Sequence, residues 1–191
     1  MLEKAQSNLA LICIDLQKEY FRKGGSLKVS CGDKVLGNVE RLLRAVRNMR
    51  MLIVHVRQVS DNLGGSTFQA GSASVEFVEA AKPVKGETVI TKSLPGAFCF
   101  TELNDILFRG NIDTIAVCGF LSFLCVGTTA REAHARGYQV YFIKDATAAI
   151  GIDDISAEIV HKVTCAIQNW AFSRVIDTDG LIEYTSKAMS V

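Results

Sequence analysis

The stretch DTIAVCGFLSFLCVGTTAREAHARGYQVYFIK (113–144) holds a complete strand–helix–strand unit. DTIAVCG (113–119) is an apolar run of strand length. CVGTTAREAHARG (125–137) has helical spacing and ends on a glycine, and YQVYFIK (138–144) is a second strand. A helix between two continuously apolar strands is typical of a parallel sheet that is covered on both faces. The stretch therefore predicts an α/β fold.

The same alternation continues on both sides of this stretch. Four more short apolar or β-branched runs predict strands, and three more segments have helical spacing. Together they predict a doubly wound, mostly parallel six-stranded sheet with helices on both faces. The further strands are expected at 9–15, 51–56, 88–91 and 173–178, and the further helices at 35–49 with Asp33 as N-cap, at 101–110 between Thr101 as N-cap and Gly110 as stop, and along Ile155, Ile159, Val163, Ile167 and Trp170, with Trp170 in the core.

Composition narrows the classes of function. The chain has 191 residues, a formal net charge of +1, 49% hydrophobic residues and 21% charged residues, so neither a disordered chain nor a nucleic-acid-binding protein is indicated. No apolar run reaches the roughly 18 residues of a membrane-spanning helix. Six cysteines form no CxxC pair, and no export signal is recognised, so we expect reduced thiols in the cytoplasm. No linker divides the chain, and one domain over 1–191 is predicted.

One connection is unusually long. Residues 58–87 join two predicted strands through about thirty residues that include several glycines and Pro83. A connection of this length in a compact domain is usually functional or interfacial. Two readings stay open: the segment, with Phe68 and Phe77, covers the site, or it contacts a second subunit.

Three chemically active side chains follow predicted strands. Asp15 ends the first strand, Lys92 follows the third, and Cys125 lies six residues after Gly119, where a helix is about to begin. Ligands of such sheets bind beyond the carboxyl ends of the strands, so the three are expected to converge there. A helix N-terminus and a lysine would favour a thiolate at Cys125, and Asp15 would accept and return a proton. Each residue taken alone also fits a structural role.

The turn before Cys125 adds a second indication. GFLSFLC (119–125) joins a strand to a helix, so its backbone N–H groups are free to point at a substrate oxygen. Its large apolar side chains suggest a dry pocket wall. A plain strand–helix loop made of apolar residues is the alternative interpretation.

These residues resemble three motifs of the isochorismatase-like cysteine hydrolases, which include nicotinamidases and N-carbamoylsarcosine amidohydrolase. ALICIDLQKEYF (10–21) is similar to the motif of the catalytic acid/base, VITKSLPGAF (89–98) to the lysine motif, and the segment 119–148 to the nucleophile motif. The three occur in order and at matching spacing, and the resemblance extends from about residue 8 to 182.

The resemblance implies a three-layer α/β/α fold and a hydrolase acting on a small molecule. Cys125 would be the nucleophile, Asp15 the acid/base and Lys92 the electrostatic partner. It also implies a cis peptide bond before Leu121 and an oxyanion hole made by the N–H groups of Leu121 and Cys125. The reaction implied is cleavage of a C–N bond of a small amide or ureido compound through a thioester. The family further implies a homo-oligomer, a dimer or tetramer.

The chain departs from nicotinamidases at their metal site. Those relatives carry an Asp-x-His pair after the second strand, whereas here His55 and Arg57 are followed by Asp61, Asn62 and Leu63. The other two histidines, at 134 and 161, lie on predicted helices and are expected to face solvent. We therefore expect no bound zinc and no cofactor.

Substrate contacts are expected on the three motifs. Ser122 and Phe123 replace the Thr-Asp pair of many relatives, and Phe100 replaces a glycine, which predicts a less polar or tighter pocket. Gln17 either binds Asp15 or substrate or is a surface residue that begins a loop. The full set of predicted substrate-binding residues is Gln17, Phe98, Phe100, Phe120, Ser122 and Phe123.

Two alternative functions stay open on the same fold. Isochorismatase itself hydrolyses a vinyl ether, a reaction that need not use a cysteine. The altered turn at Ser122 and Phe123 also allows a non-catalytic binding module in which Cys125 is a redox-sensitive thiol.

Overall fold

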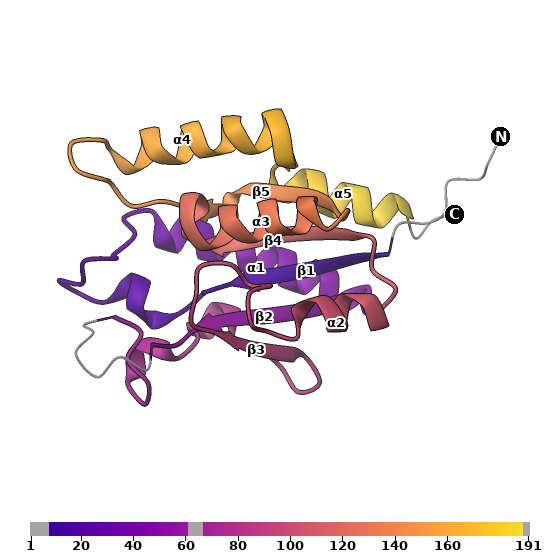
Figure 1. The fold of residues 1–191 in the computed structure, drawn as a ribbon, viewed down its shortest axis with the longest axis horizontal. Helices are drawn as coiled ribbons and strands as arrows, with labels where there is room; N and C mark the ends of the chain where they lie inside the picture. The colour runs from indigo at the N-terminus through magenta and orange to yellow at the C-terminus, as the bar shows by residue number, and fades with distance from the viewer. Residues whose placement is uncertain (1–7, 61–66, 189–191) are drawn as a thin grey trace.

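A six-stranded parallel sheet, in the order β3-β2-β1-β4-β5-β6, forms the centre of the computed structural model, which describes residues 8–60 and 67–188 (Figure 1). This confirms the predicted doubly wound parallel sheet with all six strands. The strands are β1 (Leu9–Ile14), β2 (Leu52–Gln58), β3 (Thr88–Lys92), β4 (Thr114–Phe120), β5 (Gln139–Ala148) and β6 (Arg174–Ile176).

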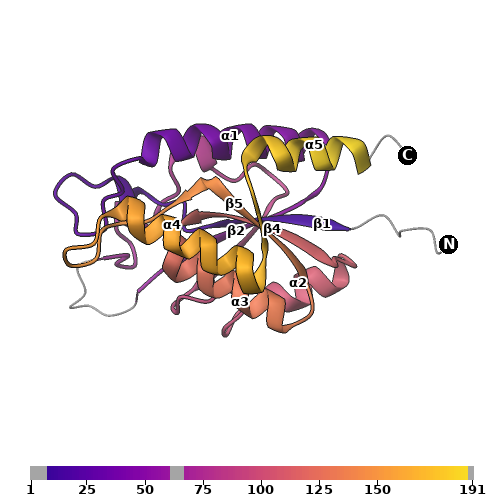
Figure 2. The ribbon, with the colours of Figure 1, turned by 90° about the horizontal axis from the view of Figure 1, so that it is seen from above.

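Helices cover both faces, as the apolar strands require. Every residue of β1 is buried, and alternate side chains enter two different cores. Leu11 and Cys13 pack with α1 and α5 on one face, whereas Ile12 and Ile14 pack with α2 and α3 on the other (Figure 2). The helices are α1 (Gly32–Asn48), α2 (Leu103–Arg109), α3 (Gly127–Ala135), α4 (Ala157–Ile167) and α5 (Thr178–Ala188).

Two element boundaries differ from the prediction for identifiable reasons. Asp33 lies inside the first turn of α1 and does not cap it, because the helix already begins at Gly32. β5 continues to Ala148 instead of ending at 144, because a register shift between Val117 and Gly119 lets its last residues pair with the end of β4. Thr101, predicted as the N-cap of the second helix, lies one residue before the observed N-cap Glu102, although its Oγ1 still accepts the Leu103 N–H at 3.2 Å.

The stripe of Ile155, Ile159, Val163, Ile167 and Trp170 is the main error of the prediction. Trp170, expected in the core, is 88% exposed, and the four aliphatic residues are also exposed. α4 lies outside the two covering layers, beyond the β5–β6 side of the sheet (Figure 1). No helix in the described part of the chain is long and apolar enough to cross a membrane.

The described parts of the long connection pack on their own chain. Phe68 is buried with its ring centroid 5.4 Å from that of Tyr20, which lies in the short turn η1 (Lys18–Phe21). Phe77 packs against His55, with centroids 5.8 Å apart. The connection therefore packs beside the turn that follows β1. Residues 61–66, including Asp61, Asn62 and Leu63, lie outside the described residues.

Candidate active site

Asp15, Lys92 and Cys125 meet at the carboxyl ends of the strands. Lys92 Nζ lies 2.8 Å from Asp15 Oδ2, and neither side chain is accessible to solvent. Cys125 lies in the π-helical turn η4 (Ser122–Val126) between β4 and α3, is 5% exposed, and is close enough to Asp15 and Lys92 for both charges to shift the pKa of its thiol. The buried ion pair therefore lies next to Cys125, the predicted nucleophile.

The backbone brings the Asp15 strand and the Cys125 turn close together. Asp15 has a φ of 53°, a left-handed conformation that Asp tolerates better than most residues, and its N–H donates to Val56 O at 2.9 Å. Gly119 has a φ of 117°, and a Cβ at this position would lie 1.9 Å from Ile14 O. Only glycine allows β1 and β4 to approach this closely where the site begins.

The nucleophile turn is held by hydrogen bonds on both sides. The Leu121 carbonyl accepts the N–H groups of Leu124 (3.1 Å) and Val126 (3.2 Å), and the Phe120–Leu121 peptide bond is cis. Thr129 Oγ1 donates to Cys125 O at 2.8 Å and accepts the Ala97 N–H at 3.0 Å. This threonine therefore links the nucleophile turn to the loop that follows Lys92.

Gln58 is a site residue that the sequence analysis missed. β2 lies between β3 and β1 in the sheet, so Lys92 has to reach across the end of β2 to meet Asp15. Gln58, the last residue of β2, accepts a hydrogen bond from Lys92 Nζ at its Oε1 (2.7 Å). Its place at the carboxyl end of a strand is the signal that could have identified it.

Burial dominates the electrostatics of the site. It raises the pKa of Asp15 above its usual value, and Lys92 partly opposes this effect. Burial, followed by the charge of Asp15, raises the pKa of Cys125 to about 12, again against the effect of Lys92. Lys92 lowers the pKa of Cys125, as expected, but burial and the charge of Asp15 outweigh this effect. The thiol is protonated at neutral pH, and Asp15 is the group placed to accept its proton.

Gln17 is not free to bind substrate. Its Oε1 accepts the Gln58 N–H at 2.8 Å, and its Nε2 donates to Gln58 O (2.9 Å) and Val75 O (3.0 Å). The side chain is fully buried. Because its amide is used by the backbone of two segments, Gln17 positions Gln58 and, through it, Lys92. Gln17 is therefore not a surface residue, and its side-chain hydrogen bonds go to the backbone of Gln58 and Val75 rather than to Asp15.

Three of the predicted aromatic contacts lie elsewhere. The Phe98 ring packs under Arg136 Cζ (4.6 Å), at the end of α3 distant from Cys125. Phe100 is 92% exposed. Phe120 is fully buried in the core, with its ring 5.1 Å from that of Tyr20. Phe98 and Phe120 therefore serve packing, and Phe100 faces solvent.

Two predicted contacts stay beside the nucleophile. Ser122 begins η4, and its Oγ is buried with no hydrogen-bond partner within the described chain. A buried hydroxyl without a partner is rare unless a ligand or water satisfies it. Phe123 is half-buried and packs at the border of the core. Ser122 is consequently the substrate contact best supported by the geometry.

The histidines take no part in this arrangement. His55 is buried in β2, with Nε2 2.8 Å from Glu87 Oε2, and burial lowers its pKa. His134 is exposed as expected. His161 is half-buried instead of solvated, with Nε2 2.9 Å from Lys144 O.

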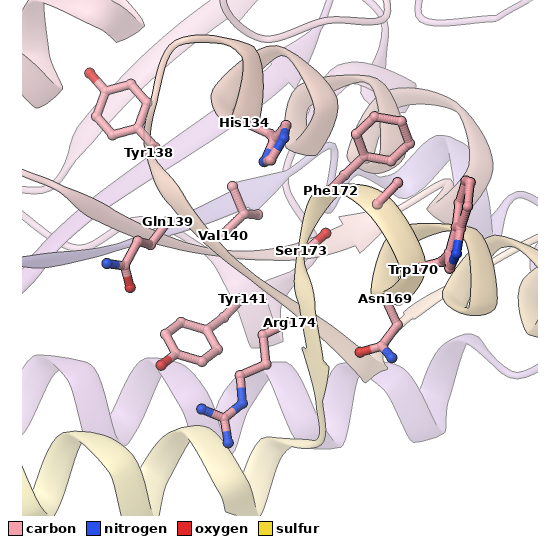
Figure 3. A pocket seen from close by; sticks show the side chains of 11 residues that line it. His134, Tyr138, Gln139, Val140, Tyr141, Asn169, Trp170, Phe172, Ser173 and Arg174 are labelled. Atoms are coloured by element: carbon pink, nitrogen blue, oxygen red, sulfur yellow. The ribbon is translucent and has the colours of Figure 1, made fainter.

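A separate pocket of about 480 Å³ opens at the other end of the sheet (Figure 3). It lies between the end of α3, the start of β5 and the π-helical turn η5 (Gln168–Phe172). Trp170 stands at one end of it, and none of the predicted catalytic residues line it. Its lining residues are His134, Tyr138, Gln139, Val140, Tyr141, Asn169, Trp170, Ala171, Phe172, Ser173 and Arg174.

Comparison with known proteins gives one consistent family. The isochorismatase domain model matches residues 9–179. An uncharacterised isochorismatase-family protein of Bacillus subtilis, YddQ, is 31% identical over 91% of this chain and 98% of its own length. The secreted isochorismatase effector Isc1 of Verticillium dahliae is 34% identical over 82% of this chain and 80% of its own. The crystal structure of an isochorismatase from Pseudomonas putida superposes with a TM-score of 0.85 at 35% identity, covering 92% of this chain and 90% of that one.

More distant relatives have names that state a reaction. A streptothricin hydrolase of Streptomyces noursei is 29% identical over 88% of this chain and 66% of its own. Nicotinamidase 3 of Arabidopsis thaliana is 25% identical over 90% of this chain and 86% of its own. The ureidoacrylate amidohydrolase of Variovorax paradoxus is 24% identical over 82% of this chain and 75% of its own.

Proposed function

This chain belongs to the isochorismatase family of hydrolases, and we propose that it cleaves a C–N bond of a small amide or ureido compound through a thioester on Cys125. The observation that carries the proposal is the buried Asp15–Lys92 ion pair in contact with a buried thiol. Amide hydrolysis by a thiol needs a nucleophile, a group that accepts and returns a proton, and a positive charge beside the reacting atoms. The site holds these three groups together.

The first half of the reaction forms the thioester. Cys125 Sγ attacks the amide carbon as its proton passes to the Asp15 carboxylate, which gives a tetrahedral intermediate with a negative oxygen. The C–N bond then breaks, and the proton on Asp15 passes to the leaving nitrogen, so ammonia or an amine departs. Because the pKa of the thiol is about 12, the proton leaves as the C–S bond forms and not before.

The second half releases the acid. A water molecule attacks the thioester carbon while Asp15 accepts one of its protons. The C–S bond breaks, and the proton returns from Asp15 to the thiolate of Cys125. A carboxyl group with a raised pKa suits both roles, because its pKa lies closer to neutral pH than that of an ordinary Asp.

Lys92 and the backbone of the nucleophile turn stabilise charge. Lys92 keeps Asp15 ionised between steps and is itself held by Gln58. We assign the oxyanion hole to the N–H groups of Leu121 and Cys125, where the chain turns from β4 into η4. The unpartnered hydroxyl of Ser122 is assigned to a polar group of the substrate.

The proposed chemistry requires Cys125 as a free thiol. All six cysteines are free, including Cys13 and Cys118, whose sulfurs lie 3.8 Å apart on neighbouring strands. We therefore propose the reducing cytoplasm as the place where the enzyme works.

Ammonia or amine release from a panel of small amides and ureido compounds tests the proposal. Cys125→Ala is expected to reduce turnover to the uncatalysed background, and Asp15→Asn to lower it by about 10²–10⁴-fold. Cys31→Ala, which removes an exposed thiol, is the matched control and should keep wild-type turnover. Wild-type turnover in folded Cys125→Ala would refute the nucleophile. Hydrolysis of a vinyl ether by that same variant would favour the isochorismatase-type reaction.

A further inference from the structure

Gln58 carries a side-chain NH2 group that the proposed reaction does not use. Its Oε1 accepts a hydrogen bond from Lys92 Nζ at 2.7 Å. A lysine ammonium only donates, so the amide oxygen has to face Lys92 and the NH2 group has to point away from it. The backbone N–H and carbonyl of Gln58 are both bonded to the Gln17 amide, at 2.8 Å and 2.9 Å. The orientation of the Gln58 carboxamide is therefore fixed by its neighbours.

The NH2 group of Gln58 has no hydrogen-bond partner in residues 8–60 and 67–188. The bond from Lys92 is the hydrogen bond that the Gln58 side chain makes there. Asp15 and Lys92 are inaccessible to solvent, whereas Gln58 is half-buried. An amide nitrogen has two N–H donors, and a donor that a ligand covers without pairing it costs binding free energy. The two donors of Gln58 are therefore available to a ligand that enters the site.

The strand pattern places this group on the face of the sheet that holds the nucleophile. Side chains two residues apart along a strand point to the same face. Val54 and Val56 precede Gln58 in this series, and both pack in the core that also contains Cys125. Gln58 is the last residue of β2 and is in register with Lys92 on β3. Its NH2 group consequently lies beside the cluster around Cys125.

The charges of the cluster indicate which acceptor the NH2 group binds. The positive charge of Lys92 is balanced by Asp15, and the raised pKa of Cys125 keeps its thiol neutral, so no net positive charge remains for a substrate carboxylate. A neutral carbonyl oxygen accepts a hydrogen bond without the cost of burying an unpaired charge. The carbonyl that is attacked has its oxygen assigned to the backbone N–H groups of the nucleophile turn. The acceptor for Gln58 is therefore a second carbonyl.

We propose that Gln58 selects substrates with a second carbonyl group close to the amide that is cleaved, and that its Nε2 donates a hydrogen bond to the oxygen of that group. N-Acylureas and diamides of short dicarboxylic acids belong to this class. The inference rests on the proposed function, because it describes the substrates of the same site. Gln58 then has two contacts: Oε1 holds Lys92, and Nε2 binds the substrate. An analogue with a CH2 group in place of the second carbonyl leaves these donors unpaired, so it should be a poor substrate.

Two ureas that differ by one carbonyl test the selection. N-Ethylurea has a CH2 group where N-acetylurea has its second carbonyl. Gln58→Met is expected to lower kcat/KM for N-acetylurea about 10–100-fold more than for N-ethylurea, and the intrinsic reactivity of each compound cancels in this comparison. Gln139→Met, at an exposed glutamine, is the matched control and should leave both values unchanged. An equal loss for both compounds in Gln58→Met shows that Gln58 only holds Lys92, and overturns the proposal.

Gln58→Glu separates the two contacts of the side chain. The carboxylate keeps an acceptor for Lys92 but has no N–H donor. We therefore expect Gln58→Glu to lose the preference for N-acetylurea over N-ethylurea, as Gln58→Met does. A folded Gln58→Glu that keeps the wild-type preference overturns the proposal.

Binding decides the proposal even where no amide is cleaved. In Cys125→Ala, titration with N-acetylurea is expected to shift the NMR resonance of the Gln58 side-chain NH2 group, whereas N-ethylurea is not. The resonance is assigned by its loss in Cys125→Ala/Gln58→Met. A shift without turnover of any amide in the wild type would refute the thioester chemistry and support the role of Gln58. Absence of a shift with N-acetylurea overturns the role of Gln58, whatever the turnover of the wild type.

Discussion

Two regions of this molecule depart from the usual distribution of polar and apolar residues. One buries charged side chains, and the other exposes apolar side chains. At the carboxyl ends of the strands, Asp15 and Lys92 are fully buried. On α4 and the turn η5 that follows it, Ile159, Val163 and Trp170 are exposed. Burying a charge pair costs several kcal/mol per ion before their attraction is counted, and exposing apolar side chains forgoes the main favourable term of folding. Such departures from local consistency are expected where a protein works.

The difference between the two regions lies in what completes them. The buried pair is compensated within its own chain by the attraction between its two charges and by Gln58, which accepts a hydrogen bond from Lys92. The apolar residues Ile159, Val163 and Trp170 are covered by nothing in the described chain. We therefore assign the first region to a small substrate, whereas the second is an uncovered apolar surface. The following substitutions test this contrast, in order of decreasing effect.

Replacement of a lysine should give the largest difference in stability between the two regions. Lys92→Met leaves Asp15 buried without its partner, so we expect the free energy of unfolding to fall by about 3–5 kcal/mol. Lys162→Met, the same change on exposed α4, should alter it by no more than about 0.5 kcal/mol. Urea denaturation measures both. The double variant Asp15→Asn/Lys92→Met should regain much of the stability without turnover. Equal costs at Lys92 and Lys162 would contradict a tightly coupled buried pair.

Glycine replacement probes the close approach of β1 and β4. In Gly119→Ala the new Cβ meets Ile14 O at 1.9 Å, and the φ of 117° is unfavourable, so we expect a loss of at least about 3 kcal/mol in unfolding free energy. Gly37→Ala, in α1 with open space around its Cβ, should instead stabilise by up to about 1 kcal/mol. Thermal and urea unfolding compare the two variants. A harmless Gly119→Ala would show that the strands need not touch here.

Loss of the Gln17 amide should cost stability more than substrate affinity. Gln17→Ala removes three hydrogen bonds to the backbone of Gln58 and Val75 and leaves buried groups unpaired, which is worth about 1–3 kcal/mol. Because Gln17 acts on Lys92 through Gln58, we expect kcat to fall while KM changes little. Gln139→Ala, at an exposed glutamine, is the control for both measurements. A rise in KM alone would restore Gln17 as a substrate contact.

The acid limb of the pH–rate profile reports Asp15. Asp15 has to be ionised to accept the thiol proton, and its pKa is raised by burial, so kcat/KM should fall with decreasing pH at a value above the ordinary 3.8. The same shift acts on folding: the stability that Asp15 contributes is present below pH 3.8 and is lost as pH rises through its higher folded pKa. An acid limb at or below 3.8 would contradict the raised pKa.

The sequence predicted those parts of the molecule that depend on the local order of residues. Continuous apolar runs gave all six strands, and the strand ends placed Asp15 and Lys92 at one edge of the sheet. The features that the sequence analysis missed depend on tertiary packing. The strand order puts Gln58 between Lys92 and Asp15, and α3 draws Phe98 towards Arg136.

The helical spacing of apolar residues identifies an apolar stripe, but it does not show whether other parts of the protein bury that stripe. The spacing of α1 and that of α4 look alike in the sequence, yet α1 buries Val39 and Leu42 whereas α4 exposes Ile159 and Val163. Burial of a titratable group is equally invisible, which is why the sequence suggested a thiolate where the structure has a protonated thiol. Both differences arise because solvent exposure depends on how the whole chain packs and not on the segment.

Alkylation of Cys125 by iodoacetamide between pH 6 and pH 10, followed by peptide mass spectrometry, tests the coupling of thiol and carboxylate most directly. In the wild type, we expect slow alkylation of Cys125 at pH 7 that still rises at pH 10, with exposed Cys31 as the internal reference for an accessible thiol. The charge of Asp15 raises the pKa of Cys125, so Asp15→Asn should make Cys125 react faster at pH 8 while turnover is lost. A pH profile of Cys125 that Asp15→Asn leaves unchanged would contradict the proposed pairing.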